Sequence, residues 1–289
     1  MVNATHLRWK LEVPDSQEEA LCAWLEAQGS NAFYREADPP RACYAYFPPE
    51  LVPPATEGLE TFAGVRLLEA ELFGDEDWLA KSREGFGSFE VGQRFHVRPL
   101  WEEQPGPQGR FDLVVNPGLA FGTGGHETTR LCLELLEQLG AANRLQGPIL
   151  DIGAGTGILS LAAHLLGADH LTAFDIDPDC GPVMDELMEL NAHLLKGARP
   201  YESFVGTLED PKVRGPYAGL LANILLNTIQ ELLPRMAEIT APGSWLVASG
   251  ILAECTDEAL LSLATHGFKP EQVKTEGEWI AILAVRVGA

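Results

Sequence analysis

One stretch of the chain, residues 149–175, constrains the fold more than any other. Its apolar run over 149–152 stops at Gly153, as expected of a strand buried on both faces of a parallel sheet. Residues 153–157 (G-A-G-T-G) form a loop with almost no side-chain bulk. From Ile158 the apolar positions recur at helical spacing up to Gly167, and a second strand over 171–174 leads to Asp175. The stretch therefore predicts a strand, a loop, a helix and a strand in succession.

This unit indicates the kind of ligand. A glycine loop between strand and helix lets a ligand lie against backbone N–H groups, and an acid at the next strand end can accept both ribose hydroxyls. Dinucleotide sites carry G-x-G-x-x-G, whereas here Gly153, Gly155 and Gly157 alternate and the bulky Ile158 follows. The pattern predicts a nucleoside. The glycines alone leave open an ordinary nucleotide site or a merely tight turn. The position of Asp175 at the end of the next strand makes both alternatives less favoured.

Charge and composition restrict the partners and the compartment. The 289 residues include 20 basic and 42 acidic ones, a net charge of −22, which repels a phosphate backbone. We expect no direct nucleic-acid partner and favour a basic protein or a small cation. No apolar run is long enough for a membrane span or a signal peptide, so we expect a cytoplasmic protein with no membrane partner. Five scattered cysteines without C-x-x-C spacing predict neither disulfides nor a metal site.

The first 72 residues predict a small α+β domain. Alternation over 6–13 indicates a half-buried strand, a helix follows over 16–29, and two strands follow at 32–36 and 42–47. A weak helix near 57–64 and a strand over 65–72 complete the order β-α-β-β-α-β of a ferredoxin-like domain. Such a domain recognises a partner or is only a packing appendage, because fold alone implies no function. We expect a linker with a short helix at 73–90 and a catalytic domain over 91–289.

The catalytic domain opens with a predicted antiparallel hairpin, 95–100 with 111–115. The segment N-P-G-L-A-F-G-T-G-G-H-E-T-T, residues 116–129, then leads into a helix over 127–139. Thr128 and Thr129 fall in the first helical turn, where free N–H groups and hydroxyls can face a ligand. A plain glycine-rich connection is the alternative. His126 is a candidate base, but a capping histidine is commoner, and we assign no catalytic residue.

The remaining elements complete a seven-stranded doubly wound Rossmann-like sheet with helices on both faces. Asp175 is followed by a helix expected to be regular from Pro182, and a short strand is expected after Phe204. Asn223 falls at the carboxyl end of a further strand, where functional groups collect in such sheets, although it is equally suited to cap the next helix. An antiparallel pair, 268–274 with 278–287, ends the chain.

Several motifs together resemble one family of class I methyltransferases. They are the 116–129 segment, L-D-I-G-A-G-T-G-I-L at 150–159, F-D-I-D-P at 174–178, A-N-I-L at 222–225, S-G-I-L at 249–252, G-E-W at 277–279 and D-E-D-W at 75–78. The set is similar to the methyltransferases of large-subunit ribosomal protein eleven, the PrmA family. The resemblance spans the whole catalytic domain, but it covers the first 70 residues only in domain type.

The resemblance implies transfer of methyl groups from S-adenosylmethionine to lysine side chains and the N-terminal amine of that ribosomal protein. It implies cofactor contacts by Thr129, Gly153, Asp175 and Asn223. Gly155 belongs to the same loop, and the acid before it, Asp151, suits the ammonium group of the cofactor, directly or through water. The N-terminal domain would hold the substrate. We further expect no metal, and a monomer.

Two departures from related patterns limit what the resemblance implies. Many amino methyltransferases carry N-P-P-Y after the fourth strand, whereas this chain has N-I-L-L at 223–226, which leaves the contacts to the acceptor amine unassigned. Ser82 stands where family linkers often carry a second Trp. A methyltransferase for another protein or a small molecule, a non-catalytic nucleoside-binding module and, third, a dehydrogenase remain as alternatives.

Overall fold

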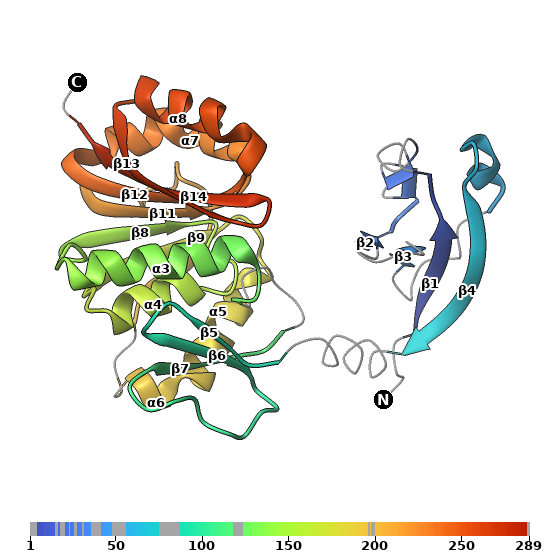
Figure 1. Cartoon of the computed structure of the whole chain (residues 1–289), viewed down its shortest axis with the longest axis horizontal. Coiled ribbons are helices and arrows are strands. Elements are labelled where there is room, and N and C mark those ends of the chain that lie inside the picture. The colour runs from blue at the N-terminus through green and yellow to red at the C-terminus, as the bar shows by residue number, and fades with distance from the viewer. Residues whose placement is uncertain are drawn as a thin grey trace. The chain divides into compact units, whose positions relative to one another are not determined.

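The computed structural model divides the chain into two compact units, Met1–Gly85 and Phe86–Ala289 (Figure 1). It describes residues 5–14, 17, 21–22, 24–25, 28–30, 32–35, 42–47, 56–74, 87–117, 124–195, 197 and 200–287. Most of the linker predicted at 73–90 lies outside these residues, so the boundaries at 72 and 90 stay predictions. Within the described part of the chain, no helix is long and apolar enough to cross a membrane.

The first unit contains a four-stranded antiparallel sheet. Its strands are β1 (Thr5–Glu12), β2 (Ala32–Arg35), β3 (Ala42–Phe47) and β4 (Arg66–Gly74), in the order β2-β3-β1-β4. This is the order a ferredoxin-like β-α-β-β-α-β chain adopts. The predicted alternation of β1 is confirmed, because Trp9 and Leu11 are buried and the Trp9 ring packs on Phe47 with centroids 5.0 Å apart.

One helix predicted in this unit was too long. Instead of a helix over 57–64, the chain forms a 3-10 helix, η2 (Thr56–Thr61). Gly58 lies against the Trp24 ring, where a Cβ would come within 2.2 Å, and Gly64 has a φ of +82°. These glycines suit a tight turn that changes direction and not a continuing α-helix. The helix predicted at 16–29 lies partly outside the described residues, and its Leu21 and Leu25 are fully buried.

The second unit is built on the predicted seven-stranded sheet. Its order is β10-β9-β8-β11-β12-β14-β13, with only β14 antiparallel to its neighbours. The order reverses between β8 and β11, which is where doubly wound sheets bind ligands. The strands are β8 (Pro148–Ile152), β9 (His170–Asp175), β10 (Glu202–Val205), β11 (Tyr217–Asn223), β12 (Thr240–Leu252), β13 (Phe268–Glu276) and β14 (Trp279–Arg286).

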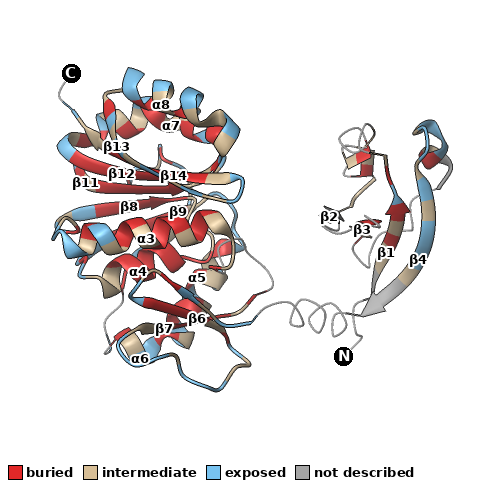
Figure 2. Ribbon diagram, viewed as in Figure 1, coloured by how far each residue is buried: buried red, intermediate tan, exposed pale blue. Residues whose placement is uncertain are grey.

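Helices cover both faces of this sheet (Figures 1 and 2). One apolar cluster joins the sheet to α3, α4 and α5, and a second joins it to α7 and α8. The buried residues gather between the helices and the sheet. The helices are α3 (Glu127–Ala141), α4 (Ile158–Leu165), α5 (Cys180–Leu190), α6 (Ala192–Leu195), α7 (Leu226–Glu238) and α8 (Thr256–Thr265), with a 3-10 turn, η3 (Ala253–Cys255), before α8.

The predicted hairpin of 95–100 with 111–115 is wrong. The strands β6 (Phe95–Pro99) and β7 (Phe111–Val115) pair in parallel, and the antiparallel partner of β6 is a third strand, β5 (Phe89–Val91). The tight turn lies earlier, at Gly92 with a φ of +52°, between β5 and β6. The glycine- and proline-rich segment after β6 is long enough to lead back to the end of the sheet where β6 begins. Strand β7 can therefore run in the same direction as β6.

Helix α5 holds the end of strand β7. The Asn191 side chain is fully buried, its Oδ1 accepts from the Val114 N–H at 2.8 Å, and its Nδ2 donates to the Val114 carbonyl at 2.8 Å. Thus Asn191 replaces a missing strand partner just before the segment that leads to α3. The helix begins at Cys180, two residues before the predicted Pro182, and β10 includes Phe204 where a strand was expected after it.

Candidate functional site

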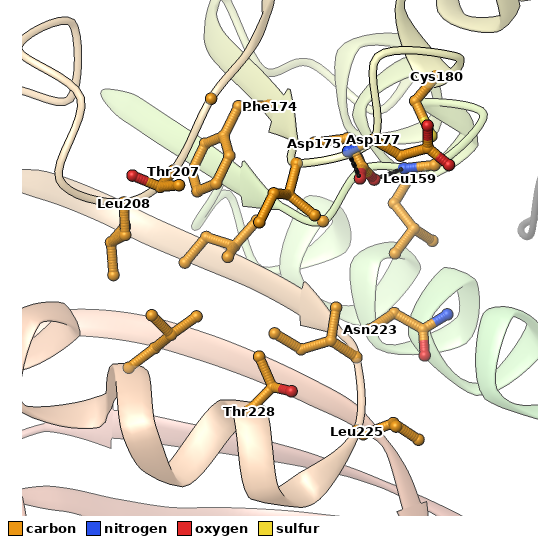
Figure 3. Close-up of a pocket in the computed structure, with 18 of the residues that line it drawn as sticks. Leu159, Phe174, Asp175, Asp177, Cys180, Thr207, Leu208, Asn223, Leu225 and Thr228 are labelled. Carbon is orange, nitrogen blue, oxygen red and sulfur yellow. Dashed lines mark hydrogen bonds between the residues drawn. The ribbon is translucent and has the colours of Figure 1, made fainter. Parts of the chain in front are cut away.

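A cavity of about 560 Å³ opens at the carboxyl ends of β8, β9 and β11 (Figure 3). It therefore lies where the strand order reverses. Five of the six residues predicted to bind the cofactor line it: Thr129, Gly153, Gly155, Asp175 and Asn223. The sixth, Asp151, does not.

The glycine loop has no room for side chains. Gly153, Gly155 and Gly157 have φ values of +68°, +54° and +82°, a conformation that other residues rarely adopt. A Cβ on Gly153 would lie 2.5 Å from Ile224 Cγ2, and one on Gly157 would lie 2.3 Å from the Tyr201 hydroxyl oxygen. The backbone turn therefore favours glycine at all three positions, and close neighbours also oppose a side chain at Gly153 and Gly157.

Asp175 stands at the end of β9 with its carboxylate fixed in place. Its Oδ2 accepts from the Gly155 N–H at 2.8 Å and its Oδ1 accepts from the Asp177 N–H at 3.0 Å (Figure 3). Two backbone donors hold the carboxylate in one orientation at the cavity wall. Each carboxylate oxygen retains a further lone pair for a ligand hydroxyl, as the prediction of a ribose contact requires.

Asp151, which was predicted to meet the ammonium group of the cofactor directly or through water, is buried. Its side chain is 1% exposed, and its Oδ2 accepts from the Ser160 hydroxyl at 2.7 Å. Burial raises the pKa of this carboxyl to about 6, against the opposing effect of the Ser160 hydrogen bond. Since Asp151 does not line the cavity, the structure does not bring it into direct contact with a ligand there. The carboxyl lies behind the glycine loop.

Thr129 and Asn223 meet although they come from distant segments. Thr129 lies in the first turn of α3, and the Asn223 Nδ2 donates to its Oγ1 at 3.3 Å. The Oδ1 of Asn223 is buried and has no hydrogen-bond partner among the described residues. The alternative that Asn223 caps the next helix is wrong, because the N-cap position of α7 is Leu225 and has no side-chain cap.

His126 performs the capping role that was considered for it. It is the N-cap residue of α3, and its Nδ1 accepts from the Thr128 N–H at 3.3 Å and lies 2.9 Å from the Thr128 Oγ1. The first turn of α3 is thereby fixed, which places Thr129 at the cavity.

Several lining residues were not among the predicted ones. The most informative are Asp177, Asp179 and Cys180 after β9, with Thr207 and Leu208 after β10. The motif F-D-I-D-P contained the signal for Asp177, but no local pattern marked the others. Burial together with the nearby carboxylates raises the pKa of the Cys180 thiol to about 12, so this thiol stays protonated and is not a nucleophile.

The charges around the cavity discriminate between ligands. Three aspartates line it, and none of the described residues that line it is Lys, Arg or His. Phosphate groups would meet no compensating cation here, whereas a cationic ligand would be stabilised. Phe174, Leu208 and Leu232 add apolar surface to the lining, as a nucleobase needs. The residues therefore fit S-adenosylmethionine, a nucleoside with a positive charge.

A family model for ribosomal protein L11 methyltransferases (PrmA) matches residues 42–287. A protein of that name from Geotalea uraniireducens is 38% identical over 214 residues, which cover 71% of this chain and 66% of that protein. One from Synechococcus elongatus is 33% identical over 297 residues and 96% of both chains. The match thus spans about two thirds of the first relative and nearly all of the second.

A solved structure supports the same relationship. The ribosomal protein L11 methylase from Lactobacillus delbrueckii subsp. bulgaricus is 26% identical with a TM-score of 0.60, over 70% of this chain and all of that chain. The sheet order and the cavity at its reversal define the class of S-adenosylmethionine-dependent methyltransferases. Within that class, the chain belongs to the ribosomal protein L11 methyltransferase (PrmA) family.

Proposed function

We propose that this chain transfers methyl groups from S-adenosylmethionine to amines of ribosomal protein L11, namely lysine side chains and the N-terminal α-amine. The observation that carries the proposal is the cavity with three aspartates and no basic residue among its described lining, at the reversal of the strand order. Family membership supports the same reaction and the same acceptor. A net charge of −22 favours approach of a basic protein.

The chain's residues would divide the work as follows. Asp175 accepts the ribose hydroxyls, Gly153 and Gly155 let the backbone approach the ligand, and Thr129 with Asn223 closes the end where transfer occurs. Asp151 acts through the loop that it supports and not by direct contact. When bound, S-adenosylmethionine supplies a methyl group on a positively charged sulfur, which an amine can displace in one step.

The site's contribution to this step is alignment and control of water. An amine nucleophile needs a lone pair directed at the methyl carbon, so positioning accounts for much of the rate. Lysine amines are mostly protonated at neutral pH, with an ordinary pKa of about 10.4, and must release a proton before attack. An apolar surrounding lowers the pKa of such an amine and favours its neutral form.

The sequence-based expectation of a cytoplasmic monomer stays a prediction, which fractionation and light scattering test.

The experiment is incubation of the purified enzyme with S-adenosylmethionine and unmethylated ribosomal protein L11, followed by intact-mass and peptide mass spectrometry. We expect mass gains in steps of one methyl group on lysines or the N-terminus, absent with Asp175→Ala. If the cofactor binds by calorimetry but L11 gains no mass, the acceptor assignment is wrong and other basic proteins are to be tested. If tight binding is found for a dinucleotide and not for S-adenosylmethionine, the reaction class itself is wrong.

A further inference from the structure

Asp151 is a buried acid that the proposed reaction uses only as a support for the glycine loop. Its side chain is 1% exposed, and it lies on β8 one residue before the end of the strand. It pairs with Ala173 of β9, two residues before Asp175 on the cavity wall. From the spacing of neighbouring strands and of residues along a strand, the Cα atoms of the two acids are about 8 Å apart. A charge on Asp151 therefore lies close to the charges that the cavity holds.

The surroundings of Asp151 do little to stabilise a negative charge. From α4 the Ser160 hydroxyl donates to its Oδ2 at 2.7 Å, and on β11 its neighbour is the apolar Leu221. The Cys132 thiol of α3, hydrogen-bonded with Ser249 of β12, is near enough to feel the Asp151 charge, but burial raises the pKa of this thiol to about 12 and keeps it neutral. Among the described residues, no Lys, Arg or His forms an ion pair with Asp151. Such a place favours the protonated carboxyl.

Charge on the cavity wall reaches Asp151 through the loop. Burial raises the pKa of the Asp151 carboxyl to about 6 against the effect of the Ser160 hydrogen bond, and the negative charge of Asp175 raises it further. Salt screens this interaction little, because Asp151 is buried. A positive charge in the cavity acts with the opposite sign and favours the ionised carboxylate. Asp151 can therefore respond to the charge of a ligand that it does not touch.

We propose that Asp151 makes the site prefer the cationic methyl donor to the uncharged product, by releasing a proton when S-adenosylmethionine binds and taking one up when the positive charge leaves. The inference deepens the proposed function and rests on it. The ionised carboxylate stabilises a positive charge in the cavity, and the protonated carboxyl does not. Asp151 is therefore a residue that determines specificity through space and not a catalytic residue.

The positive charge moves with the methyl group. The amine nitrogen forms a bond to the methyl carbon with its lone pair, the carbon–sulfur bond breaks, and the electron pair of that bond stays on sulfur. The sulfur is then neutral, and the methylated amine carries the charge. When this amine leaves, Asp151 takes a proton from solvent. The product S-adenosylhomocysteine, which lacks the sulfonium charge, is then held less tightly than the donor was.

The proposal predicts how affinity depends on pH. If binding lowers the pKa of Asp151 by one unit, the affinity for S-adenosylmethionine rises about fivefold from pH 5 to pH 7, because the ionised form binds more tightly. The affinity for S-adenosylhomocysteine should stay within about twofold over the same range. The amino and carboxyl groups of both ligands keep their charges in this range, since their ordinary pKa values are about 8 and about 3.5.

The test is calorimetry of the full-length enzyme without acceptor, at about pH 6, in two buffers with different heats of ionisation. The difference in heat between the buffers counts the protons released. We expect about 0.4 proton for each S-adenosylmethionine bound and less than about 0.1 for S-adenosylhomocysteine. Sinefungin carries an ammonium-bearing carbon in place of the methylated sulfur, so it keeps the charge without a transferable methyl group. It should release as many protons as S-adenosylmethionine.

Three variants identify the group that titrates. Asp151→Asn has no proton to release, so proton release should disappear and the preference for S-adenosylmethionine over S-adenosylhomocysteine should no longer vary with pH. Ser160→Ala removes a donor that stabilises the carboxylate, so release should persist with its midpoint moved to higher pH. Asp169→Asn is the matched control, because Asp169 precedes β9 and its side chain is 61% exposed. It should behave as the wild type does.

The outcomes separate this proposal from the proposed function. If S-adenosylmethionine binds without proton release, or if Asp151→Asn releases as many protons as the wild type, the role assigned to Asp151 is wrong. Equal release with S-adenosylhomocysteine also overturns it, since Asp151 would then not respond to the charge on sulfur. Should Asp151→Asn not fold, an unmoved midpoint in Ser160→Ala overturns the proposal instead. If the wild type releases protons as expected but L11 gains no methyl group, the role of Asp151 stands and the proposed reaction fails.

Discussion

The ends of the neighbouring strands β8 and β9 carry the same residue type in opposite surroundings. Asp151 pairs with Ala173 of β9, so it lies only two positions from the level of Asp175. Asp175 lines the cofactor cavity and accepts from two backbone N–H groups, whereas Asp151 is 1% exposed and accepts from Ser160. Burial, and not the residue type or the motif, therefore decides which acid can meet a ligand.

The buried acid supports the loop from behind. The N-cap position of α4 is Gly157, which has no side chain to satisfy the first N–H groups of the helix. Ser160 lies in that first turn, and its hydroxyl donates to Asp151. Asp151 thus links β8 to the start of α4 across the glycine loop, and its negative charge suits the helix N-terminus.

The largest effect that the comparison predicts is the loss of Asp175. Asp175→Ala would remove the two charge-assisted hydrogen bonds proposed for the ribose, about 4 kcal/mol or roughly a thousandfold in cofactor affinity. Asp169→Ala is the matched control, because Asp169 precedes the same strand and its side chain is 61% exposed. Calorimetry with S-adenosylmethionine measures both variants. Equal loss in the two, or no loss in Asp175→Ala, would contradict the ligand role.

The next effect concerns stability and pH. Burial, aided by the nearby Asp175 charge, places the pKa of folded Asp151 at about 6, above its ordinary value of 3.8. The folded protein therefore holds this proton more tightly than the unfolded chain, so stability falls as pH rises from about 4 to about 6. Asp151→Asn removes this loss, which amounts to about 3 kcal/mol at most.

Urea unfolding at a series of pH values measures this effect. The stability of Asp151→Asn relative to the wild type should grow between about pH 4 and pH 7, while cofactor affinity changes less than about tenfold. Asp169→Asn should show no such trend, since its carboxyl is mostly in water. A difference that does not vary with pH, or a thousandfold loss of affinity, would place Asp151 on the ligand side of the loop.

Much of the catalytic fold could be predicted from the sequence because local patterns and global packing agree there. The run before Gly153 and the helical spacing after Ile158 specify a strand, a loop and a helix, and the strand, β8, pairs with β11 on one edge and β9 on the other. The prediction of an antiparallel β6–β7 hairpin was wrong because the relative direction of two strands depends on the path of the chain that connects them. Composition alone does not reveal that.

The site was predictable only in part, for a similar reason. Asp175, Thr129 and Asn223 lie at strand or helix ends, where position along the element already implies position at the edge of the sheet. Asp151 lies one residue before the end of β8, and the direction of its side chain depends on its packing against α4. The smaller cavity beside the first is lined by residues of α3, β12, β14 and the end of β11, so no single stretch of the sequence predicts it.

Gly157→Ala sharpens the comparison at the loop itself. Gly157 has a φ of +82°, and an added Cβ would lie 2.3 Å from the Tyr201 hydroxyl, but the residue does not line the cavity. We expect a loss of about 2 kcal/mol in the free energy of unfolding and only a few-fold loss of cofactor affinity. Gly167→Ala, at a φ of +113° with open space around it, is the control for backbone strain alone. A larger effect on affinity than on stability would show that the whole loop acts as ligand surface.

Ser160→Ala has the smallest expected effect, and it tests the link between Asp151 and helix α4. Ser160 is fully buried and donates to the Asp151 carboxylate, whereas Ser249, equally buried, donates to the neutral Ile280 carbonyl. Losing a donor to a charged group should cost about 1 kcal/mol more above pH 6 than below it. Ser249→Ala should cost about as much at every pH, because neither partner titrates. If both variants lose the same stability at pH 5 and pH 8, Asp151 is not charged in the folded protein, and its support of α4 is that of a neutral hydrogen-bonding group.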